Sequence, residues 1–403
     1  MMADVHERAR HQGSPAEVFA VFLKLGLTSF GGPIAHLGYF RDELVTRRKW
    51  LSEQAYGDLV ALCQFLPGPA SSQTGFALGL MRAGWLGALA AFAAFTLPSA
   101  LALIIFAYTA TSISGPLGAG ALNGLKLVAV AIVAQAVWGM ARNLCPDRER
   151  ATIAVAAVAV LAFVPGPFNM IAAIAAGALA GVVLGRGNGN SERGHVTVAV
   201  PGSVAVAALL IFASLLVILP LLAEQSQVIA VFDGFYRAGA LVFGGGHVVL
   251  PLLETEVVEP GWVTQSQFLA GYGAAQAVPG PLFTFAAYLG ATLEPAPHGI
   301  AGAFIALLAV FLPGFLILIG VLPFWDRFRR LGWTQSLMQG ANAAVVGILG
   351  AALYSPVFTG SITNLKEFTL ALACFVLLML WKAPPWAVVL LAGAGGAALA
   401  LFP

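Results

Sequence analysis

The sequence predicts an all-α, polytopic membrane protein made of two inverted-topology repeats. Three observations support this prediction: a composition unsuited to water, apolar runs of membrane-spanning length, and a set of four motifs that occurs twice. The 403 residues are 59% hydrophobic and only 9% charged, whereas about a quarter of the residues of soluble domains are charged. We therefore expect the chain to fold in a lipid bilayer.

The apolar runs predict helical spans. A helix needs about 20 apolar residues to cross ~30 Å of hydrocarbon, and these runs lack the alternating polarity of a lipid-facing β-barrel. Nine runs are interpreted as full spans: residues 84–108, 117–140, 151–164, 168–184, 203–222, 299–322, 338–354, 368–381 and 386–402.

Composition and motifs exclude several classes of function. The net charge of +2 is far too small for a nucleic-acid partner. The three cysteines are isolated, and no Walker A, GxSxG or HExxH motif occurs. The first 15 residues lack the apolar core of a cleaved signal peptide. We expect neither an enzyme nor a protein that needs a metal or another cofactor.

Four motifs return in the same order. FLKLGLTSFGGP at residues 22–33 is answered by FYRAGALVFGGG at 235–246, a shift of 213. WLSEQ at 50–54 is answered by WVTQS at 262–266, and QFLPGP at 64–69 by QAVPGP at 276–281, both shifted by 212. FTLPSAL at 95–101 matches FLPGFL at 311–316. We predict an N-terminal repeat at 1–184, a polar, glycine-rich linker at 185–202 and a C-terminal repeat at 203–403 with core motifs at 235–356.

The loops that precede the second motif predict that the halves are inverted. The first half carries a basic stretch at residues 41–49, and the second carries three glutamates at 254–259. Because basic loops stay cytoplasmic, the two loops should lie on opposite sides of the membrane.

The Gly31-Gly32 and Pro67-Gly68-Pro69 segments, with their second copies, interrupt the helices. They could be broken spans or re-entrant hairpins, and the positive-inside rule favours hairpins. With hairpins, five spans separate the two pairs, the N-terminus lies inside, and only Lys366 is misplaced. The basic residues then inside are Arg8, Arg10, Arg41, Arg47, Arg48, Lys49, Arg82, Arg142, Arg148, Arg150, Arg186, Arg193, Arg327, Arg329, Arg330 and Lys382.

The two Pro-Gly-Pro turns are candidate oxyanion sites. Proline ends the preceding helix, and the free N–H groups of the next helix favour an anion. Simple helix capping is the competing interpretation of the hydroxyls that follow. The proposed substrate contacts here are Gln64, Gly68, Ser71, Ser72, Gln276, Gly280 and Thr284, and the helix-breaking residues are Pro67, Pro69, Pro279 and Pro281.

A second group of candidates precedes these turns. Lys24 and Arg237 are related by the 213 shift and lie inside apolar segments, where an ionisable residue suggests function. Two cations from inverted halves would suit a tetrahedral dianion, although snorkelling to the interface is the alternative. The adjacent glycines, which allow close approach to the backbone, complete the predicted site: Gly31, Gly32, Gly244 and Gly245.

FGGP, the basic loop with WLS, QFLPGP, and the second copies FGGG and QAVPGP together resemble the chromate ion transporter family, over residues 22–356. The resemblance implies a duplicated, antiparallel transporter of the bacterial plasma (inner) membrane that exports chromate and gives chromate resistance. Membrane potential or proton motive force would drive export. Alternatives are a transporter of sulfate or another oxyanion, and an anion channel. A homodimer stays open.

The two halves differ after the second turn. Leu282 and Phe283 stand where the first half has polar residues. We therefore expect the first half to supply most of the hydrogen bonds to a substrate.

Overall fold

The structure is a computed structural model that describes residues 13–110, 115–164, 166, 169–185, 200–325 and 331–401. Over these ranges the chain is all-helical, as predicted. Residues 186–199, which are most of the predicted linker, lie outside the described residues. So do seven of the basic residues assigned to the inner side: Arg8, Arg10, Arg186, Arg193, Arg327, Arg329 and Arg330.

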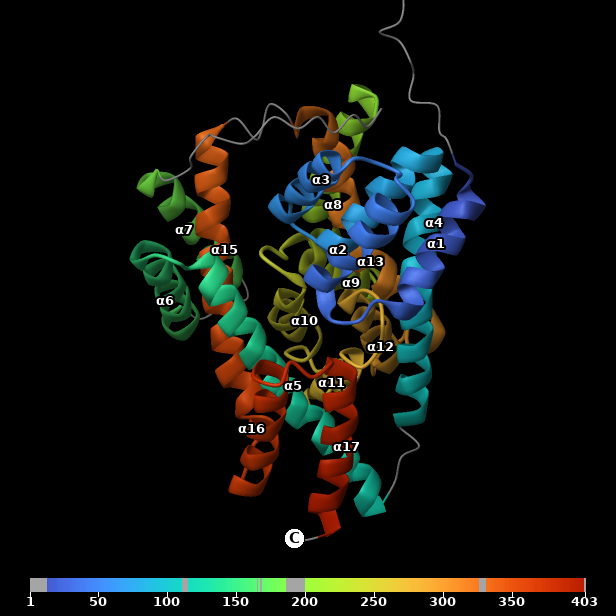
Figure 1. The fold of residues 1–403 in the computed structure, drawn as a ribbon. Coiled ribbons are helices and arrows are strands. Elements are labelled where there is room, and N and C mark those ends of the chain that lie inside the picture. The colour runs from blue at the N-terminus through green and yellow to red at the C-terminus, as the bar shows by residue number, and fades with distance from the viewer. Residues whose placement is uncertain are drawn as a thin grey trace, which may run out of the picture.

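Over the described ranges, the helices of the second half follow one another in the same order as those of the first half (Figure 1). The first-half helices are α1 Pro15–Thr28, α2 Gly32–Phe40, α3 Glu53–Phe65, α4 Ala70–Ala110, α5 Gly115–Leu144, α6 Arg148–Phe163 and α7 Asn169–Leu184. The second-half helices are α9 Gln227–Ala240, α10 Val249–Val257, α11 Gln265–Ala275, α12 Phe285–Thr292, α13 Gly299–Val321, α15 Gly332–Ala352, α16 Leu365–Met379 and α17 Pro385–Leu401. One helix, α8 Gly202–Leu222, precedes the second repeat without a counterpart.

Matched capping residues start the matched helices. Ser52 caps α3 and Thr264 caps α11, each by accepting a backbone N–H with its hydroxyl. Asp147 caps α6 with its carboxylate oxygen and Asn364 caps α16 with its amide oxygen, each accepting a backbone N–H. Because a capping side chain satisfies an N–H that the helix cannot, these residues set where each helix begins.

Both broken segments of the first half return to the side from which they started. Arg82 lies at the end of the first limb of α4, and its guanidinium bonds Glu17 at the start of α1 over 3.0 Å. The same guanidinium lies 5.1 Å from the ring centre of Trp50, in the loop after α2. The start of α1, the end of the first hairpin and the end of the second therefore meet at one point. The predicted re-entrant hairpins are confirmed.

The helix α4 contains a sharp reversal rather than one straight rod. Ala83 and Gly84 leave helical geometry, with Gly84 at φ 67°. Gly79 and Gly87 then pack backbone to backbone across the reversal. Residues 70–82 thus form the return limb of the second hairpin, and residues 85–110 form a membrane-spanning helix.

The second half repeats this arrangement upside down. Glu294, the counterpart of Arg82, donates its N–H to the carbonyl of Trp262, the counterpart of Trp50, over 2.8 Å. The hydroxyl of Tyr108, at the end of α4, lies beside Gly299, at the start of α13. The counterparts α4 and α13 pack side by side, with the end of α4 next to the start of α13. They therefore run in opposite directions. The predicted inversion of the repeats is confirmed.

Five helical segments among the described residues are long and apolar enough to cross a membrane, where the sequence predicted nine spans. They are Ala70–Ala110, Gly115–Leu144, Gly202–Gln225, Gly299–Phe324 and Gly332–Phe358. The other four predicted spans are helices α6, α7, α16 and α17, of 16, 16, 15 and 17 residues, below the usual ~20. They come in pairs, so the inversion does not depend on whether each pair crosses.

The later helices of each half pack against the other half. In Figure 1, α5 and α17 lie side by side, and α7 lies beside α15. Small residues allow this close approach: Gly124 contacts the backbone of Ala392, and Gly181 contacts that of Ser336 and Gly340. Close packing through glycine is a usual way for helices to associate in a membrane. These contacts between the later helices hold the two halves together around the hairpins.

Candidate functional site

The Pro-Gly-Pro turn of each half bonds the glycine-run segment of the other half. Gly68 donates its N–H to the carbonyl of Val242 over 2.8 Å, and Gly280 donates to the carbonyl of Ser29 over 2.9 Å. Ser29 and Val242 are themselves related by the 213 shift. The four broken segments therefore form one crossed arrangement about the axis that relates the halves.

The glycine runs also meet each other. The ring of Pro33 packs on Gly246, and Nε2 of His247 faces Gly32. Gly31 and Gly32 have φ of 99° and 77°, and Gly244 and Gly245 have φ of 75° and 151°, a region that favours glycine. Gly31 is exposed, and the other three glycines are half-buried. The turns thus present backbone groups that a ligand can approach.

Gln73 locks the first Pro-Gly-Pro turn in place. Its Nε2 donates to the carbonyl of Pro67 over 3.0 Å and to that of Gly314, in α13, over 2.9 Å. Its Oε1 is buried without a hydrogen-bond partner. Because Nε2 of Gln73 donates both of its hydrogens to backbone carbonyls, only the amide oxygen remains available, as an acceptor in the interior.

The first half supplies most of the polar side chains at the crossing, and the second half adds His247, beside Gly32, and Asn342, beside Gly244. His36 is 1% exposed and its Nδ1 lies 3.4 Å from Oγ of Ser71. Its ring also meets Phe95 edge-on at 5.4 Å, and Oγ of Ser99, one turn further along α4, lies beside Gly280. Unpaired buried polar atoms are rare, and they commonly mark function. Those around the crossing are Ser29 Oγ, His36 Nε2, Ser72 Oγ and Gln73 Oε1 of the first half and Asn342 Oδ1 of the second half.

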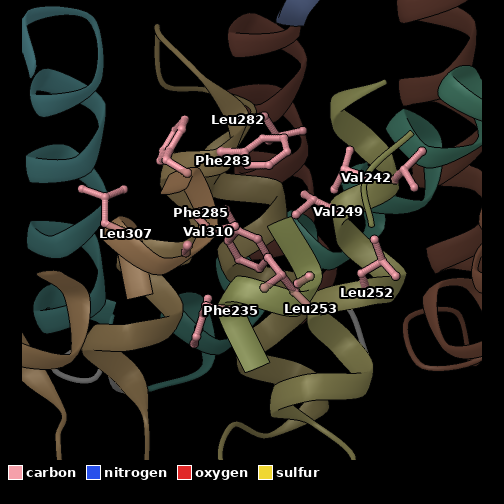
Figure 2. Close-up of a cluster of buried hydrophobic side chains, with 14 of the residues drawn as sticks. Phe235, Val242, Val249, Leu252, Leu253, Leu282, Phe283, Phe285, Leu307 and Val310 are labelled. Carbon is pink, nitrogen blue, oxygen red and sulfur yellow. The ribbon is translucent and has the colours of Figure 1, made fainter. Parts of the chain in front are cut away.

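The second half fills the equivalent positions with hydrocarbon. The second-half counterparts are all buried and apolar: Val242 for Ser29, Val249 for His36, Phe283 for Ser71 and Phe285 for Gln73. Figure 2 shows these side chains gathered in one apolar cluster with Phe235, Leu252 and Leu253. Thr284, the hydroxyl that matches Ser72, is already used, because it donates to the carbonyl of Pro281 over 2.7 Å. The two halves therefore contribute unequally to the site.

Each predicted cation lies against a carboxylate of its own half. Nζ of Lys24 is 3.2 Å from Oε2 of Glu43, and the Lys24 side chain is 52% exposed. Glu43 is also paired with Arg47 at 2.6 Å and Arg48 at 2.8 Å. Burial alone would raise the pKa of Glu43, but the hydrogen bonds from Arg48 and Lys24 and the nearby positive charges outweigh it and hold this pKa below its usual value.

Arg237 has the matching partner. Its Nη2 donates to Oε2 of Glu256 over 2.7 Å, and Glu256 is related to Glu43 by the same shift of 213 that relates Arg237 to Lys24. A second carboxylate, Asp233, lies 3.2 Å from Nε of Arg237. The ion pairs are thus repeated, although their charge balance differs.

The remaining predicted contacts divide between the crossing and its surroundings. Ser71, Ser72, Gly68, Gly280 and the four prolines lie at the crossing. Gln64, near the end of α3, is exposed. Gln276 ends α11, and its Nε2 is buried without a partner.

Sequence reasoning missed several residues of this site. His36 and Gln73 have no polar counterpart in the second half, so the repeat gave no signal for them. Glu43 and Glu256 did carry a signal, because they obey the 213 shift.

Comparisons with known proteins agree with the duplicated arrangement. The chromate transporter family model matches residues 16–182 and, a second time, residues 229–397. The chain belongs to the chromate transporter family. Each of the two matched segments holds one glycine run and one Pro-Gly-Pro turn.

Curated relatives in the chromate transporter family match over nearly the whole chain. A chromate transport protein of Pseudomonas aeruginosa is 29% identical over 398 residues, covering 96% of this chain and 92% of that protein. A probable chromate transport protein of Synechococcus elongatus is 28% identical over 365 residues, covering 90% and 88%. A chromate transport protein of Cupriavidus metallidurans is 27% identical over 370 residues, covering 90% of this chain and 87% of that protein. No solved structure matches this chain significantly.

Proposed function

We propose that this protein exports chromate across the bacterial plasma (inner) membrane, with the dianion bound at the crossing of the Pro-Gly-Pro turns and glycine runs. Family membership supports chromate as the substrate. The observation that carries the site is the crossed pair of hydrogen bonds from Gly68 and Gly280, surrounded by unpaired polar atoms of the first half.

The chemistry of the crossing suits a tetrahedral oxyanion. Hydroxyl and imidazole N–H groups can donate to its oxygens, and the start of α4 directly after Pro69 adds a favourable dipole. Broken helices that meet at mid-depth are the usual place for substrate in transporters built from inverted repeats. Ser71, Ser72 and His36 would supply the hydrogen bonds, and the second half would supply shape.

The charge around the two ion pairs differs between the halves. In the first half, three cations (Lys24, Arg47 and Arg48) face one carboxylate, a surplus of two positive charges. In the second half, Arg237 faces two carboxylates, a surplus of one negative charge when both are ionised. A dianion is therefore attracted to the first-half cluster, which the positive-inside rule places on the cytoplasmic side, and repelled by the second-half cluster.

The membrane potential can supply the driving force. Each charge moved through 100 mV is worth ~2.3 kcal/mol, so a dianion that leaves an inside-negative cell gains about twice this amount. Fixed charges on the protein change affinity on each side without changing this equilibrium. Export can thus proceed without ATP.

Uptake into inside-out membrane vesicles tests the proposal. With an interior-positive potential, vesicles that contain the protein should accumulate radiolabelled chromate with saturable kinetics, and unlabelled sulfate shows by competition whether the site separates the two dianions. Flux that rises linearly with chromate concentration would indicate a channel. Accumulation no greater than in vesicles without the protein would overturn the proposal.

A further inference from the structure

We propose that Asp233, Arg237 and Glu256 form a proton-binding site in the second repeat, and that a proton bound there strengthens the binding of the oxyanion. The second part rests on the proposed chromate transport, whereas the first does not.

The geometry places two carboxylates on one guanidinium. Glu256 accepts a hydrogen bond from Nη2 of Arg237 at 2.7 Å. Oδ2 of Asp233 lies 3.2 Å from Nε of Arg237, but this Nε is without a hydrogen bond, so the contact is one of charge alone. Asp233 is 3% exposed, and its Oδ1 is buried without any partner.

Such a cluster favours one bound proton. With both acids ionised it carries one uncompensated negative charge away from water, which is unfavourable in a low dielectric. A proton on either carboxylate converts it into a carboxylic acid, leaves a neutral cluster and gives the unpaired oxygens a donor. The two acids share Arg237, so the cluster titrates as a unit.

The first repeat is built to prevent this protonation. Ala20 stands at the position of Asp233, so the second acid is missing there. Arg47 and Arg48, which bind Glu43, have Pro260 and Gly261 as their counterparts. One repeat therefore gives its glutamate three cations, and the other gives the equivalent glutamate one cation, Arg237, which it shares with Asp233.

The surrounding elements add no further cation among the described residues. Helices α8, α13 and α15, which pack on α9 or α10, carry no charged side chain over their described lengths. The charged and titratable groups on the elements around the cluster are Glu224, Asp233, Tyr236, Arg237, His247, Glu254, Glu256 and Glu259.

The proton affinities of these groups agree with the geometry. Burial raises the pKa of Glu256 to about 7, with Asp233 and Glu259 adding to the effect and Arg237 opposing it. Burial also raises the pKa of Asp233 against the charge of Arg237. Glu254, which does not contact Arg237, has its pKa raised to about 7 by burial and by Glu259. It therefore must be removed from any measurement of the cluster.

Infrared spectroscopy of the purified, reconstituted protein tests the proton site directly. In E254Q, a protonated-carboxyl band should appear as the pH is lowered from 8 to 6. In D233N/E254Q and in E254Q/E256Q this band should be lost, because the remaining carboxylate has Arg237 to itself and stays ionised. A band of unchanged size in both double variants would refute the proton site, whether or not the protein transports chromate.

Binding measurements test the control of affinity. In E254Q, equilibrium binding of radiolabelled sulfate, which remains a dianion in this range, should weaken severalfold from pH 6 to pH 8. Chromate itself takes up a proton in this range, so its binding is measured at pH 8 only. D233N/E254Q should lose most of this pH dependence. An equal dependence in both proteins would overturn the control of affinity. Absence of binding by either anion to both proteins would instead count against the proposed function, while the infrared result stands.

Discussion

The backbone N–H of Gly68 donates a hydrogen bond to the carbonyl oxygen of Val242 over 2.8 Å, and so joins the turn of one half to the glycine run of the other. The equivalent bond from Gly280 to Ser29 completes the crossing. Neither half can form its site alone, because each turn is held by the partner repeat. This mutual support explains why both motifs occur twice.

Substitution of Gly68 by alanine should disrupt the crossing. Gly68 has φ 115°, and a Cβ there would lie 2.9 Å from Cα of Gly314, which is backbone and cannot move aside easily. Strain and overpacking together should cost about 2–4 kcal/mol. Thermal unfolding in detergent measures the loss of stability. Gly57, whose Cβ would meet open space on α3, provides the control, and G57A should match the wild-type protein. Equal unfolding temperatures for G68A and G57A would contradict the tight crossing.

Removal of the two matched cations should have different effects on stability. Both K24A and R237A are expected to lose chromate transport if these residues contact substrate. In K24A, Glu43 keeps Arg47 and Arg48, and the exposed lysine contributes less than about 1 kcal/mol. In R237A, two carboxylates with little exposure lose their cation, a loss on the order of 3 kcal/mol. R237K should recover much of this stability, and equal destabilisation of K24A and R237A would argue against the unequal clusters.

The inverted repeats should be visible to a membrane-impermeant thiol reagent. Thr46 and Glu259 are exposed and follow equivalent hairpins. In a variant without Cys63, Cys145 and Cys374, T46C and E259C should react from opposite sides of sealed vesicles. Labelling of both from the same side would exclude the inversion, and the side that labels T46C fixes the absolute orientation.

Acid should weaken the first-half cluster. The pKa of Glu43 is held below its usual value, so its ion pairs stabilise the folded state above the ordinary glutamate pKa of ~4.3, and this contribution is lost as the pH falls through the lowered value. Unfolding temperatures between pH 6 and pH 3 should therefore fall more steeply for the wild-type protein than for E43Q. Parallel curves would show that Glu43 titrates alike in the folded and unfolded chain.

The sequence allowed the inverted hairpins to be predicted because proline and glycine interrupt helices and because lysine and arginine report the side of a loop. Helix ends were harder to predict. Residues 151–164 and 168–184 are apolar, yet α6 and α7 are only 16 residues long, since hydropathy measures composition and not where a helix stops. The crossing itself has no sequence signature, because Gly68 and Val242 meet through backbone atoms.

The candidate site was only partly predictable for a similar reason. Symmetry pointed to Lys24 and Arg237, and the same shift applied to acids would have found Glu43 and Glu256. His36 lies buried beside Ser71. Its counterpart is Val249, so a search for repeated residues passes over it.

The central claim is that chromate binds at the crossing through hydroxyls of the first half. The most direct test is the concentration of chromate that half-saturates uptake into inside-out vesicles, measured for S71A/S72A and T284V. Loss of the two first-half hydroxyls should raise this concentration at least about tenfold, which corresponds to about 1.4 kcal/mol. T284V should stay near the wild-type value, because the Thr284 hydroxyl already donates its hydrogen to the carbonyl of Pro281. Equal shifts in both variants, or none in S71A/S72A, would contradict the account.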